Sequence, residues 1–455
     1  MKIVMIGTGY VGLVSGSCFS EFGFTVTCVD KDAAKIEALN AGQIPIYEPG
    51  LDDVVARNRQ AGRLSFTTSL AEAVREADAV FIAVGTPTRR GDGHADLSYV
   101  YEAARQVATH LTGYTVIVTK STVPVGTGRQ IQNIISETNP EADFDVASNP
   151  EFLREGSAIS DFMRPDRVVV GAETTRAVEV MRGLYRPLYL IETPVLVTTL
   201  ETAELIKYAA NAFLAVKISY INQIADLCEE VGANVHDVAK GMGLDKRIGA
   251  KFLHPGPGYG GSCFPKDTLA LVKTAEIYGR DISLVSEVVS YNDERKRKMA
   301  DRVISSCGGS VEAKTIALLG LAFKPETDDM RESPAIEIAR ILAEKGAVLT
   351  AYDPAAMEEA KPLLPDNVTY CQNVDMCLKD ADCAVIITEW NEFRALTTSR
   401  FEEQMAGRII VDLRNVYDPV HFIDAGFSYS SIGRPLNKSG LILLSSLASL
   451  QGMRG

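Results

Sequence analysis

The segment 258–267, Gly-Tyr-Gly-Gly-Ser-Cys-Phe-Pro-Lys-Asp, brings together residue types that suit covalent catalysis. Cys263 lies in a glycine-rich run, and Lys266 and Asp267 follow it closely. Glycines let a backbone approach a ligand, and backbone N–H groups with a nearby cation favour the nucleophilic thiolate. Because a free cysteine is also often a small buried hydrophobe, this segment alone allows either a reactive thiol or a tight structural loop.

A second chemical pattern lies at the N-terminus. Residues 7–12, Gly-Thr-Gly-Tyr-Val-Gly, separate an expected strand at 2–6 from an expected helix at 11–22, and a further strand at 24–29 ends at Asp30. Glycines at this spacing, in this context, are typical of a dinucleotide-binding turn. The pyrophosphate would lie at the helix N-terminus. Asp30 would bind the ribose hydroxyls and repel a 2′-phosphate, which favours NAD over NADP.

Polar loops follow three further apolar strands, which we expect at 79–84, 115–119 and 145–148. Thr86, Thr122 and Glu151 lie in these loops. Ligands of parallel α/β sheets bind at the carboxyl ends of the strands. Turn and capping chemistry would also explain any one of these residues by itself.

Residues 201–230 predict one long helix, since they contain neither Gly nor Pro and Gly232 follows them. Thr198 and Glu201 have the spacing of a capping box. The length suits a helix that bridges two domains or forms a dimer seam. Lys207 and Asn211 share a face of it because they are four residues apart, although a lysine without other context is most often a solvated surface charge.

A second α/β unit is expected to begin near Lys314. Residues 315–323 predict a strand and turn, 333–345 a helix and 347–351 a strand, while 381–388 echo 77–84. Gly320 is followed by Leu-Ala-Phe-Lys, so the dinucleotide pattern is lost and this unit should bind something else, or only part of a nucleotide. The charged run 291–314 should join the helical middle to this unit.

These elements predict an α/β protein with two Rossmann-like doubly wound domains joined by a long central helix. We expect an NAD-binding domain at 1–197, a central helical and dimerisation domain carrying the Cys263 loop at 198–300, and a C-terminal domain at 301–455.

Composition excludes several classes of function. The 455-residue chain carries a net charge of −13, which argues against nucleic acid or an anionic membrane as partner. No segment has the apolar length of a membrane span, and the N-terminus lacks the pattern of a secretory signal. We therefore expect a cytoplasmic protein. The eight cysteines form no CxxC pair, so metal sites and redox dithiols are not expected. Without an export signal the compartment should be reducing, so disulfides are not expected either.

Taken together, these motifs resemble the nucleotide-sugar 6-dehydrogenases, the UDP-glucose/GDP-mannose dehydrogenase family, over roughly residues 1–420. The resemblance rests on the glycine turn, the Cys263 segment and five further motifs: Val84–Thr88, Lys120–Pro124, Asn149–Gly156, Lys207-x-x-x-Asn211 and Phe323-Lys324. Among the members, the UDP-glucose-oxidising type is most similar. The resemblance implies a four-electron oxidation of UDP-glucose at C6 to UDP-glucuronate, with NAD as cofactor and two NAD per turnover.

The resemblance also implies roles for single residues. Cys263 would capture the C6 aldehyde as a thiohemiacetal and become a thioester that water cleaves. Lys207 would stabilise the developing oxyanion or take part in proton transfer, and Asn211 would donate a hydrogen bond to the same oxygen. Asp267 and Thr122 would position water, and Glu151 would serve thioester hydrolysis. The division of proton transfer among Lys207, Asp267 and Glu151 stays open.

Two binding sets are implied in the same way. The expected NAD ligands are Gly7, Gly9, Tyr10, Val11, Gly12, Asp30, Lys35, Thr86, Thr122, Glu155, Lys266 and Arg331. The expected UDP-glucose ligands are Glu151, Phe152, Leu153, Glu155, Lys207, Asn211, Arg247, Phe252, Leu253, His254, Gly256, Tyr259, Gly260, Lys324 and Arg414. Arg247 would reach the site of a partner subunit, so a homodimer or a higher homo-oligomer is expected.

Other functions are weighed against this one. GDP-mannose and UDP-N-acetylmannosamine dehydrogenases belong to the same family, but the latter tend to have His where this chain has Ser262. A 3-hydroxyacid dehydrogenase shares the N-terminal domain and a Lys-x-x-x-Asn helix, yet it transfers one hydride and needs no thiol. A non-catalytic NAD-binding protein would not need the chemical residues retained here.

Overall fold

The computed structural model describes residues 1–89 and 93–434. The chain folds into two compact units. Of these described residues, the first unit contains those in 1–212 and 266–282, and the second contains 213–265 and 283–434. The end of the predicted C-terminal domain, 435–455, lies outside the described residues.

The first unit is built on an eight-stranded sheet of order β3-β2-β1-β4-β5-β6-β7-β8. Neighbouring strands pair in parallel except β6 with β7, which are antiparallel. The strands are β1 (Lys2–Ile6), β2 (Thr25–Val29), β3 (Leu64–Thr67), β4 (Ala79–Ile82), β5 (Thr115–Thr119), β6 (Phe144–Ser148), β7 (Val168–Ala172) and β8 (Val195–Thr198).

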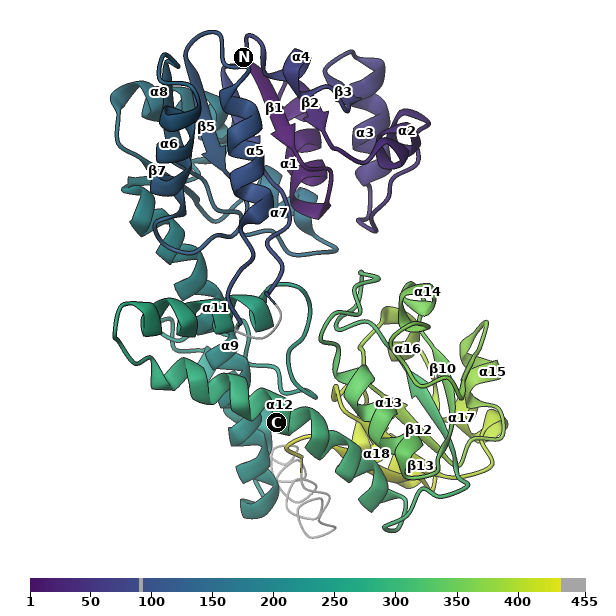
Figure 1. Ribbon diagram of the computed structural model, residues 1–455. Helices are drawn as coiled ribbons and strands as arrows, with labels where there is room; N and C mark the ends of the chain where they lie inside the picture. The colour runs from purple at the N-terminus through teal and green to yellow at the C-terminus, as the bar shows by residue number, and fades with distance from the viewer. Residues whose placement is uncertain (90–92, 435–455) are drawn as a thin grey trace, which may run out of the picture. The chain divides into compact units, whose positions relative to one another are not determined.

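Helices cover both faces of this sheet (Figure 1), as buried parallel strands require. Ile3 and Met5 of β1 pack in one apolar cluster, and Val4 and Ile6 pack in another, because successive side chains of a strand point to opposite faces. The first cluster includes residues of α1 (Tyr10–Glu21), α2 (Ala33–Asn40), α3 (Leu51–Gln60), α7 (Ala158–Met163) and α8 (Thr175–Leu184), and the second includes residues of α4 (Leu70–Val74), α5 (Ser98–Ala108) and α6 (Thr127–Thr138).

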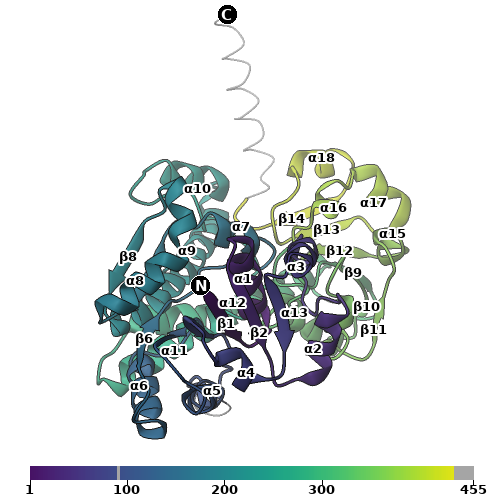
Figure 2. The ribbon, with the colours of Figure 1, turned by 90° about the horizontal axis from the view of Figure 1, so that it is seen from above.

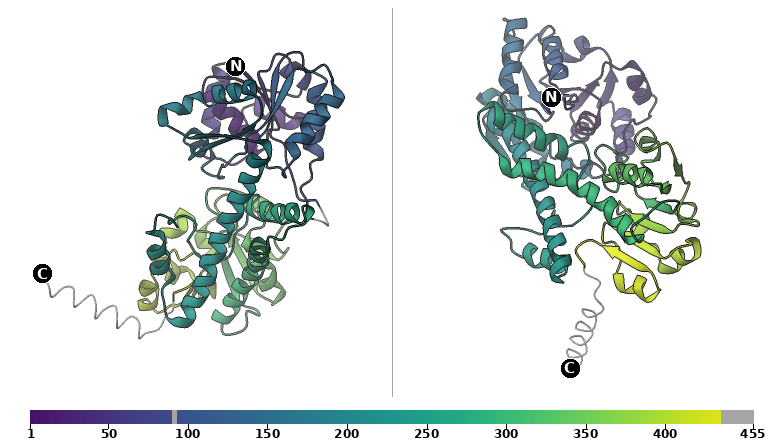
Figure 3. Two further views of the ribbon diagram at one scale, coloured as in Figure 1. Left: turned by 90° about the vertical axis from the view of Figure 1, so that its left-hand side faces the viewer. Right: turned by 60° about the horizontal axis from the view of Figure 1, so that its bottom comes forward.

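The middle of the chain is helical. The long helix α9 (Leu200–Val231), the teal helix of Figure 3, begins in the first unit and ends in the second. The predicted capping box of Thr198 and Glu201 is wrong: the Thr199 hydroxyl accepts the Thr202 N–H at 3.2 Å, and Glu201 pairs with Arg129. The other helices are α10 (Val235–Gly243), α11 (Phe264–Ile277) and α12 (Ser283–Ser306).

The second unit contains a six-stranded parallel sheet of order β11-β10-β9-β12-β13-β14, which can be followed in Figure 2. This is the order of the first six strands of the other sheet, so both units are doubly wound. The strands are β9 (Thr315–Leu319), β10 (Val348–Tyr352), β11 (Val368–Tyr370), β12 (Cys383–Ile386), β13 (Ile409–Asp412) and β14 (Ser428–Ser431), with helices α13 (Pro334–Glu344), α14 (Met357–Ala360), α15 (Val374–Leu378), α16 (Asn391–Arg394), α17 (Thr398–Gln404) and α18 (Pro419–Asp424).

The second sheet keeps only the start of the dinucleotide turn. Gly320 follows β9 with a φ of +90°, as Gly7 follows β1 with a φ of +100°. At the end of β10, however, Asp353 is 1% exposed and accepts the N–H groups of Leu321 and Ala322 at 2.7 and 3.0 Å. Trp390 also donates to it. Because Asp353 is almost fully buried as well as hydrogen-bonded, whereas the side chain of Asp30 is 13% exposed, Asp353 closes the turn instead of offering a ribose site.

The predicted fold class of two Rossmann-like domains and a long central helix is confirmed, with element ends within two residues of those expected. The charged run 291–314 is largely helix α12, and Arg295 within it is buried. The three-domain division stays a prediction. Among the described residues, no helix combines the length and apolar character needed to cross a membrane.

Candidate active site

The glycine turn of the first unit leaves room for a ligand at one position. A Cβ on Gly7 would lie 2.6 Å from the Ala83 carbonyl oxygen, and one on Gly12 would lie 2.0 Å from the Gly7 carbonyl oxygen. Gly9, which precedes α1, has nothing within 4 Å of that position. Gly7 and Gly12 are therefore required by packing, while Gly9 opens a cradle at a helix N-terminus that fits a pyrophosphate.

Asp30 stands next to this cradle. It accepts the Thr8 N–H at 2.9 Å and the Thr8 hydroxyl at 2.7 Å, and Lys35 lies 3.8 Å away. Burial raises the pKa of Asp30, but the hydrogen bonds from Thr8 and Asp32 and the charge of Lys35 outweigh it, so the pKa lies below its ordinary value. The ionised carboxylate fits the ribose of a dinucleotide. These residues suit NAD.

Glu48 ties the glycine helix to the loop after β6, and sequence reasoning missed it. Its carboxylate accepts the N–H groups of Gly156 and Ala158 at 2.7 and 2.8 Å and the hydroxyl of Tyr10. Glu48 is 7% exposed. Buried acids that satisfy backbone donors fix a loop, so Glu48 holds the segment that carries Glu155.

Glu151 and Lys207 form a buried ion pair. Lys207 Nζ donates to Glu151 Oε1 at 2.9 Å, and the two side chains are 4% and 5% exposed. Glu151 Oε2 accepts the Leu153 N–H at 2.6 Å. Burial raises the pKa of Glu151, but the charge and hydrogen bond of Lys207 outweigh it, so the pKa lies below its ordinary value. Phe152 lies against this pair, with Lys207 Nζ 5.4 Å from its ring centre.

A second buried lysine, Lys120, lies at the end of β5. Its Nζ donates to Asn149 Oδ1 at 2.9 Å and to the Tyr185 hydroxyl at 3.2 Å. Burial lowers the pKa of Lys120 to about 8, with the charge of Lys207 acting in the same direction and that of Glu151 opposing it. The sequence signal was a lysine directly after an apolar parallel strand, where ligand sites occur, but no role had been assigned to it.

Asn211 and Asp267 form a second buried contact. Asn211 Nδ2 donates to Asp267 Oδ2 at 2.6 Å, and Lys266 Nζ donates to Asp267 Oδ1 at 2.7 Å. Asp267 is fully buried and Asn211 is 6% exposed. A carboxylate and an amide held in this way are fixed before any ligand arrives.

In the loops after β4 and β5, Thr86 donates to the Thr122 carbonyl at 3.0 Å.

The thiol loop belongs to the second unit, where Cys263 is half-buried. Gly261 has a φ of +82° and donates its N–H to the Arg331 carbonyl at 2.7 Å. A Cβ on it would lie 2.6 Å from the Phe323 ring, and one on Gly260 would lie 2.4 Å from the Glu332 carbonyl oxygen. The glycines therefore let the loop pack directly against the segment after β9.

Arg414 lies in the same unit, after β13. It donates to the carbonyls of Ile387 and Phe323 at 2.7 and 2.9 Å and pairs with Glu389 at 3.1 Å. A Cβ on Gly256 would lie 3.1 Å from its Nη1. Arg414 is thus set beside the Phe252–Gly260 loop. The side chain of Arg247 is 89% exposed and pairs with Asp245, and His254 is exposed.

The structure therefore brings the expected site residues together in two groups. The first unit joins Glu151 with Lys207, Asn211 with Asp267 and Lys266, and Thr86 with Thr122. The second unit joins the Cys263 loop with Phe323 and Arg331, and Arg414 with Gly256. In the residues that the structure describes, no cluster of His, Cys, Asp or Glu could hold a metal ion.

A dinucleotide turn with its acid, two fixed pairs of polar side chains and a thiol in a glycine loop together define a dehydrogenase that uses NAD. The chain belongs to the UDP-glucose/GDP-mannose dehydrogenase family. The family's NAD binding domain matches residues 1–189, its central domain matches 201–294 and its UDP binding domain matches 317–419.

Known relatives match nearly the whole chain. The chain is 60% identical to a UDP-glucose 6-dehydrogenase of Rhizobium meliloti (strain 1021), with 96% of this chain and 100% of that protein covered. It is 48% identical to the UDP-glucose 6-dehydrogenase TuaD of Bacillus subtilis (strain 168), with 95% and 93% covered. A solved UDP-glucose dehydrogenase from Pyrobaculum islandicum is 39% identical, with 95% and 98% covered and a TM-score of 0.88.

Proposed function

We propose that this chain oxidises UDP-glucose at C6 to UDP-glucuronate, with two NAD consumed per sugar. The observation that carries the proposal is the near-complete match, at 60% identity, to a UDP-glucose 6-dehydrogenase, in a chain whose own residues supply each chemical group that the reaction needs. The half-buried thiol, the buried Glu151–Lys207 pair and the buried Asn211–Asp267 contact are those groups.

The second of the two oxidations needs a thiol. Oxidation of a primary alcohol to a carboxylate removes two hydrides, and bound NAD accepts each of them. The aldehyde formed first has no hydroxyl on C6 from which a second oxidation can start. Addition of Cys263 gives a thiohemiacetal that can lose a second hydride and become a thioester, and it also keeps the intermediate on the protein. Water then releases the acid and regenerates the thiol.

The fixed polar side chains supply proton transfer and charge stabilisation. Lys207 and Asn211 lie four residues apart on α9 and are both buried, so their N–H groups are set in place before an oxyanion develops on the substrate. Such preorganised donors stabilise a transition state without reorganisation at the moment of reaction. Asp267, with Thr122, positions water, and Glu151 promotes hydrolysis of the thioester.

NAD binds through the Gly7–Gly12 turn, Asp30, Lys35, Thr86, Thr122, Glu155, Lys266 and Arg331. UDP-glucose binds through Glu151–Glu155, Lys207, Asn211, the Phe252–Gly260 loop, Lys324 and Arg414, with Arg247 contributed from a partner subunit. Because the chain as a whole is acidic, the positive charge that binds the diphosphate must come from nearby arginines and lysines.

The proposal also covers the assembly and the location. The second-unit part of α9 exposes Phe213, Tyr220 and Leu227 at 63%, 47% and 55%. They recur every seven residues and so form one stripe, as in helix pairs. We infer a homodimer that forms through this stripe. We also infer a central domain at 198–300, which follows the first Rossmann-like domain and precedes the second in the sequence. The proposed location is the cytoplasm.

Replacement of the thiol tests the covalent step. The Cys263→Ser variant should keep its affinity for UDP-glucose, measured by calorimetry, because serine is nearly isosteric. It should form no UDP-glucuronate, measured by chromatography, since a hydroxyl is a far weaker nucleophile at neutral pH. Cys371→Ser, which changes a buried thiol directly after β11, is the matched control and should make the acid. Normal acid production by Cys263→Ser would remove the thiol from its assigned role.

A further inference from the structure

Two neighbouring side chains of α12 hold the backbone of the loop that leads to Cys263. Asn292 accepts the Tyr259 N–H at 2.8 Å through Oδ1 and donates to the Tyr259 carbonyl at 3.0 Å through Nδ2. One turn later, Arg295 Nε donates to the Gly256 carbonyl at 2.7 Å. Asn292 is 3% exposed and Arg295 is 1% exposed. Both therefore give their hydrogen bonds to this loop in the protein interior.

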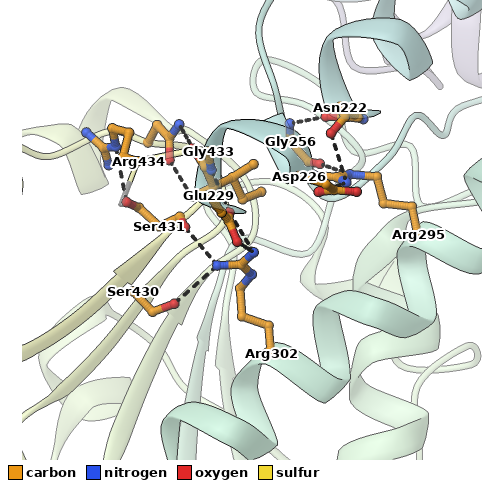
Figure 4. Close-up of polar contacts among 12 residues, drawn as sticks. Asn222, Asp226, Glu229, Gly256, Arg295, Arg302, Ser430, Ser431, Gly433 and Arg434 are labelled. Atoms are coloured by element: carbon orange, nitrogen blue, oxygen red, sulfur yellow. Dashed lines mark hydrogen bonds and ion pairs between the residues drawn. The ribbon is translucent and has the colours of Figure 1, made fainter. Parts of the chain in front are cut away.

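Arg295 is itself held in place from α9, as Figure 4 shows. Its Nη1 donates to Asp226 Oδ1 of that helix at 2.8 Å. It also donates to the hydroxyl of Tyr291, which lies on α12 itself, at 3.0 Å. Asn222 accepts the Gly256 N–H at 2.9 Å, so both polar groups of the Gly256 peptide backbone are bound by side chains. A buried guanidinium is a weak source of stability because its desolvation is expensive. The hydrogen bond from Arg295 to the Gly256 carbonyl therefore explains why this guanidinium is buried.

The other side of the loop is closed by packing. Gly260 and Gly261 lie against Phe323 and the Glu332 carbonyl, while Gly258 lies on the α12 side, where a Cβ would be 3.0 Å from Asn292 Oδ1. Residues 256–261 are thus enclosed between α12 on one side and the segment 323–332 on the other. Cys263 follows Gly261 by two residues, so its backbone position depends on this enclosure.

We propose that Asn292 and Arg295 are positioning residues for Cys263: they fix residues 256–261 so that the thiol captures the aldehyde before it escapes. The inference rests on the proposed function, and it adds two α12 residues that would not touch the reacting atoms. A displacement of about 1 Å in a catalytic group can cost about 100-fold in rate. Release of the loop should therefore slow capture more than it slows the first oxidation.

Helix α12 also provides a matched control. Arg302 lies two turns beyond Arg295 and donates to both oxygens of Glu229 at 2.7 Å and to the Ser431 carbonyl at 2.8 Å. Gly433 donates its N–H to the same glutamate at 2.6 Å. Arg302 thus ties α12 to α9 and to the end of β14. It makes none of the contacts with residues 256–261 described above.

The test compares Asn292→Ala and Arg295→Lys with Arg302→Lys. The ratio of NADH formed to UDP-glucuronate formed is measured with hydroxylamine present to trap released aldehyde, and the hydroxamate that hydroxylamine forms from the thioester is counted with the acid. Wild type and Arg302→Lys should give a ratio of two. Both positioning variants should exceed two and should make acid about 10- to 100-fold more slowly. Loss of folded enzyme lowers the total yield but leaves the ratio unchanged, so the ratio separates positioning from stability.

Hydrogen exchange read by mass spectrometry tests the same inference without turnover. Amides of residues 256–263 should exchange at least about 10-fold faster in the positioning variants than in Arg302→Lys, because the free energy of local opening is lower. A ratio of two with unchanged exchange in both variants would overturn the inference. If wild type makes no UDP-glucuronate from UDP-glucose, the proposed function fails, and the exchange rates alone decide whether α12 holds the loop.

Discussion

Buried charges dominate the account at the scale of single residues. Glu151 and Lys207 compensate each other in the interior of the first unit, and their side chains are 5% and 4% exposed. Removal of one partner leaves the other charged without compensation, which costs about 3–5 kcal/mol of unfolding free energy. An exposed ion pair contributes only about 0–1 kcal/mol to the free energy of unfolding. The large effect expected here therefore comes from the burial of the pair.

A double-mutant cycle tests this dependence. Glu151→Gln and Lys207→Met should each lower the free energy of unfolding by about 3–5 kcal/mol, measured by urea denaturation. The double variant should recover most of the loss because no buried charge remains. Glu358→Gln, in a surface pair whose side chains are 48% and 81% exposed, is the control and should change little. Additive losses in the double variant would mean that the two side chains act independently.

Lys120 predicts a dependence of stability on alkaline pH. Its pKa is about 8 in the folded protein, against an ordinary value of 10.5 that applies to the unfolded chain, so between these values the unfolded chain binds more protons. Stability contributed through Lys120 therefore rises with pH in this window and is constant below it. Relative to Lys120→Met, wild type should gain about 3 kcal/mol from pH 8 to 10.5.

The control for this experiment is Lys240→Met, since Lys240 is exposed. Its difference in unfolding free energy from wild type should stay flat across the same pH window. A flat difference for Lys120→Met as well would show that burial does not perturb this lysine.

For single side chains, the sequence predicts position along a helix better than it predicts burial. The spacing of Lys207 and Asn211 placed them on one face of a helix, as observed, but the burial of Lys207 depends on tertiary packing that no local pattern encodes. The same holds for Lys120, Glu48 and Arg295. Arg295 lies in a charged run that reads as solvated surface, and only the approach of α9 and the thiol loop buries it.

At the scale of elements, the glycine turn shows what local sequence does encode. The positive φ of Gly7 and the close contact at Gly12 follow from the spacing of the glycines in the strand-turn-helix unit, so the turn and its neighbours were predicted almost to the residue. The second unit could be predicted as a repeat of this plan. The role of Asp353 in closing the Gly320 turn could not, because it depends on burial and on a hydrogen bond from Trp390, which only the tertiary fold brings to Asp353.

Two alanine substitutions in the turn should separate binding from folding. Gly9→Ala places a methyl group in the open cradle with a φ of −73°, which alanine tolerates. It should keep the melting temperature within a few degrees and raise the KM for NAD at least about 10-fold. Gly12→Ala meets the Gly7 carbonyl at 2.0 Å and should instead lower the melting temperature. Unchanged KM for NAD in Gly9→Ala would place the pyrophosphate elsewhere.

At the scale of the whole molecule, the apolar stripe on α9 predicts the assembly. Contiguous exposed apolar surface is typical of interfaces. Tyr220→Glu combined with Leu227→Glu should convert a dimer to a monomer in sedimentation velocity experiments, since two charges on each copy would be buried against the other. Ser399→Glu, at an exposed position on α17, is the control and should remain dimeric. A double variant that still sediments as a dimer would locate the interface on another surface.

The stoichiometry of the wild-type reaction tests the proposed four-electron oxidation. Purified protein is incubated with UDP-glucose and NAD, and the NADH formed per sugar consumed is measured together with the product. The account predicts two NADH and UDP-glucuronate. One NADH per sugar, with the reaction ending at the aldehyde, would contradict it and would remove the need for Cys263.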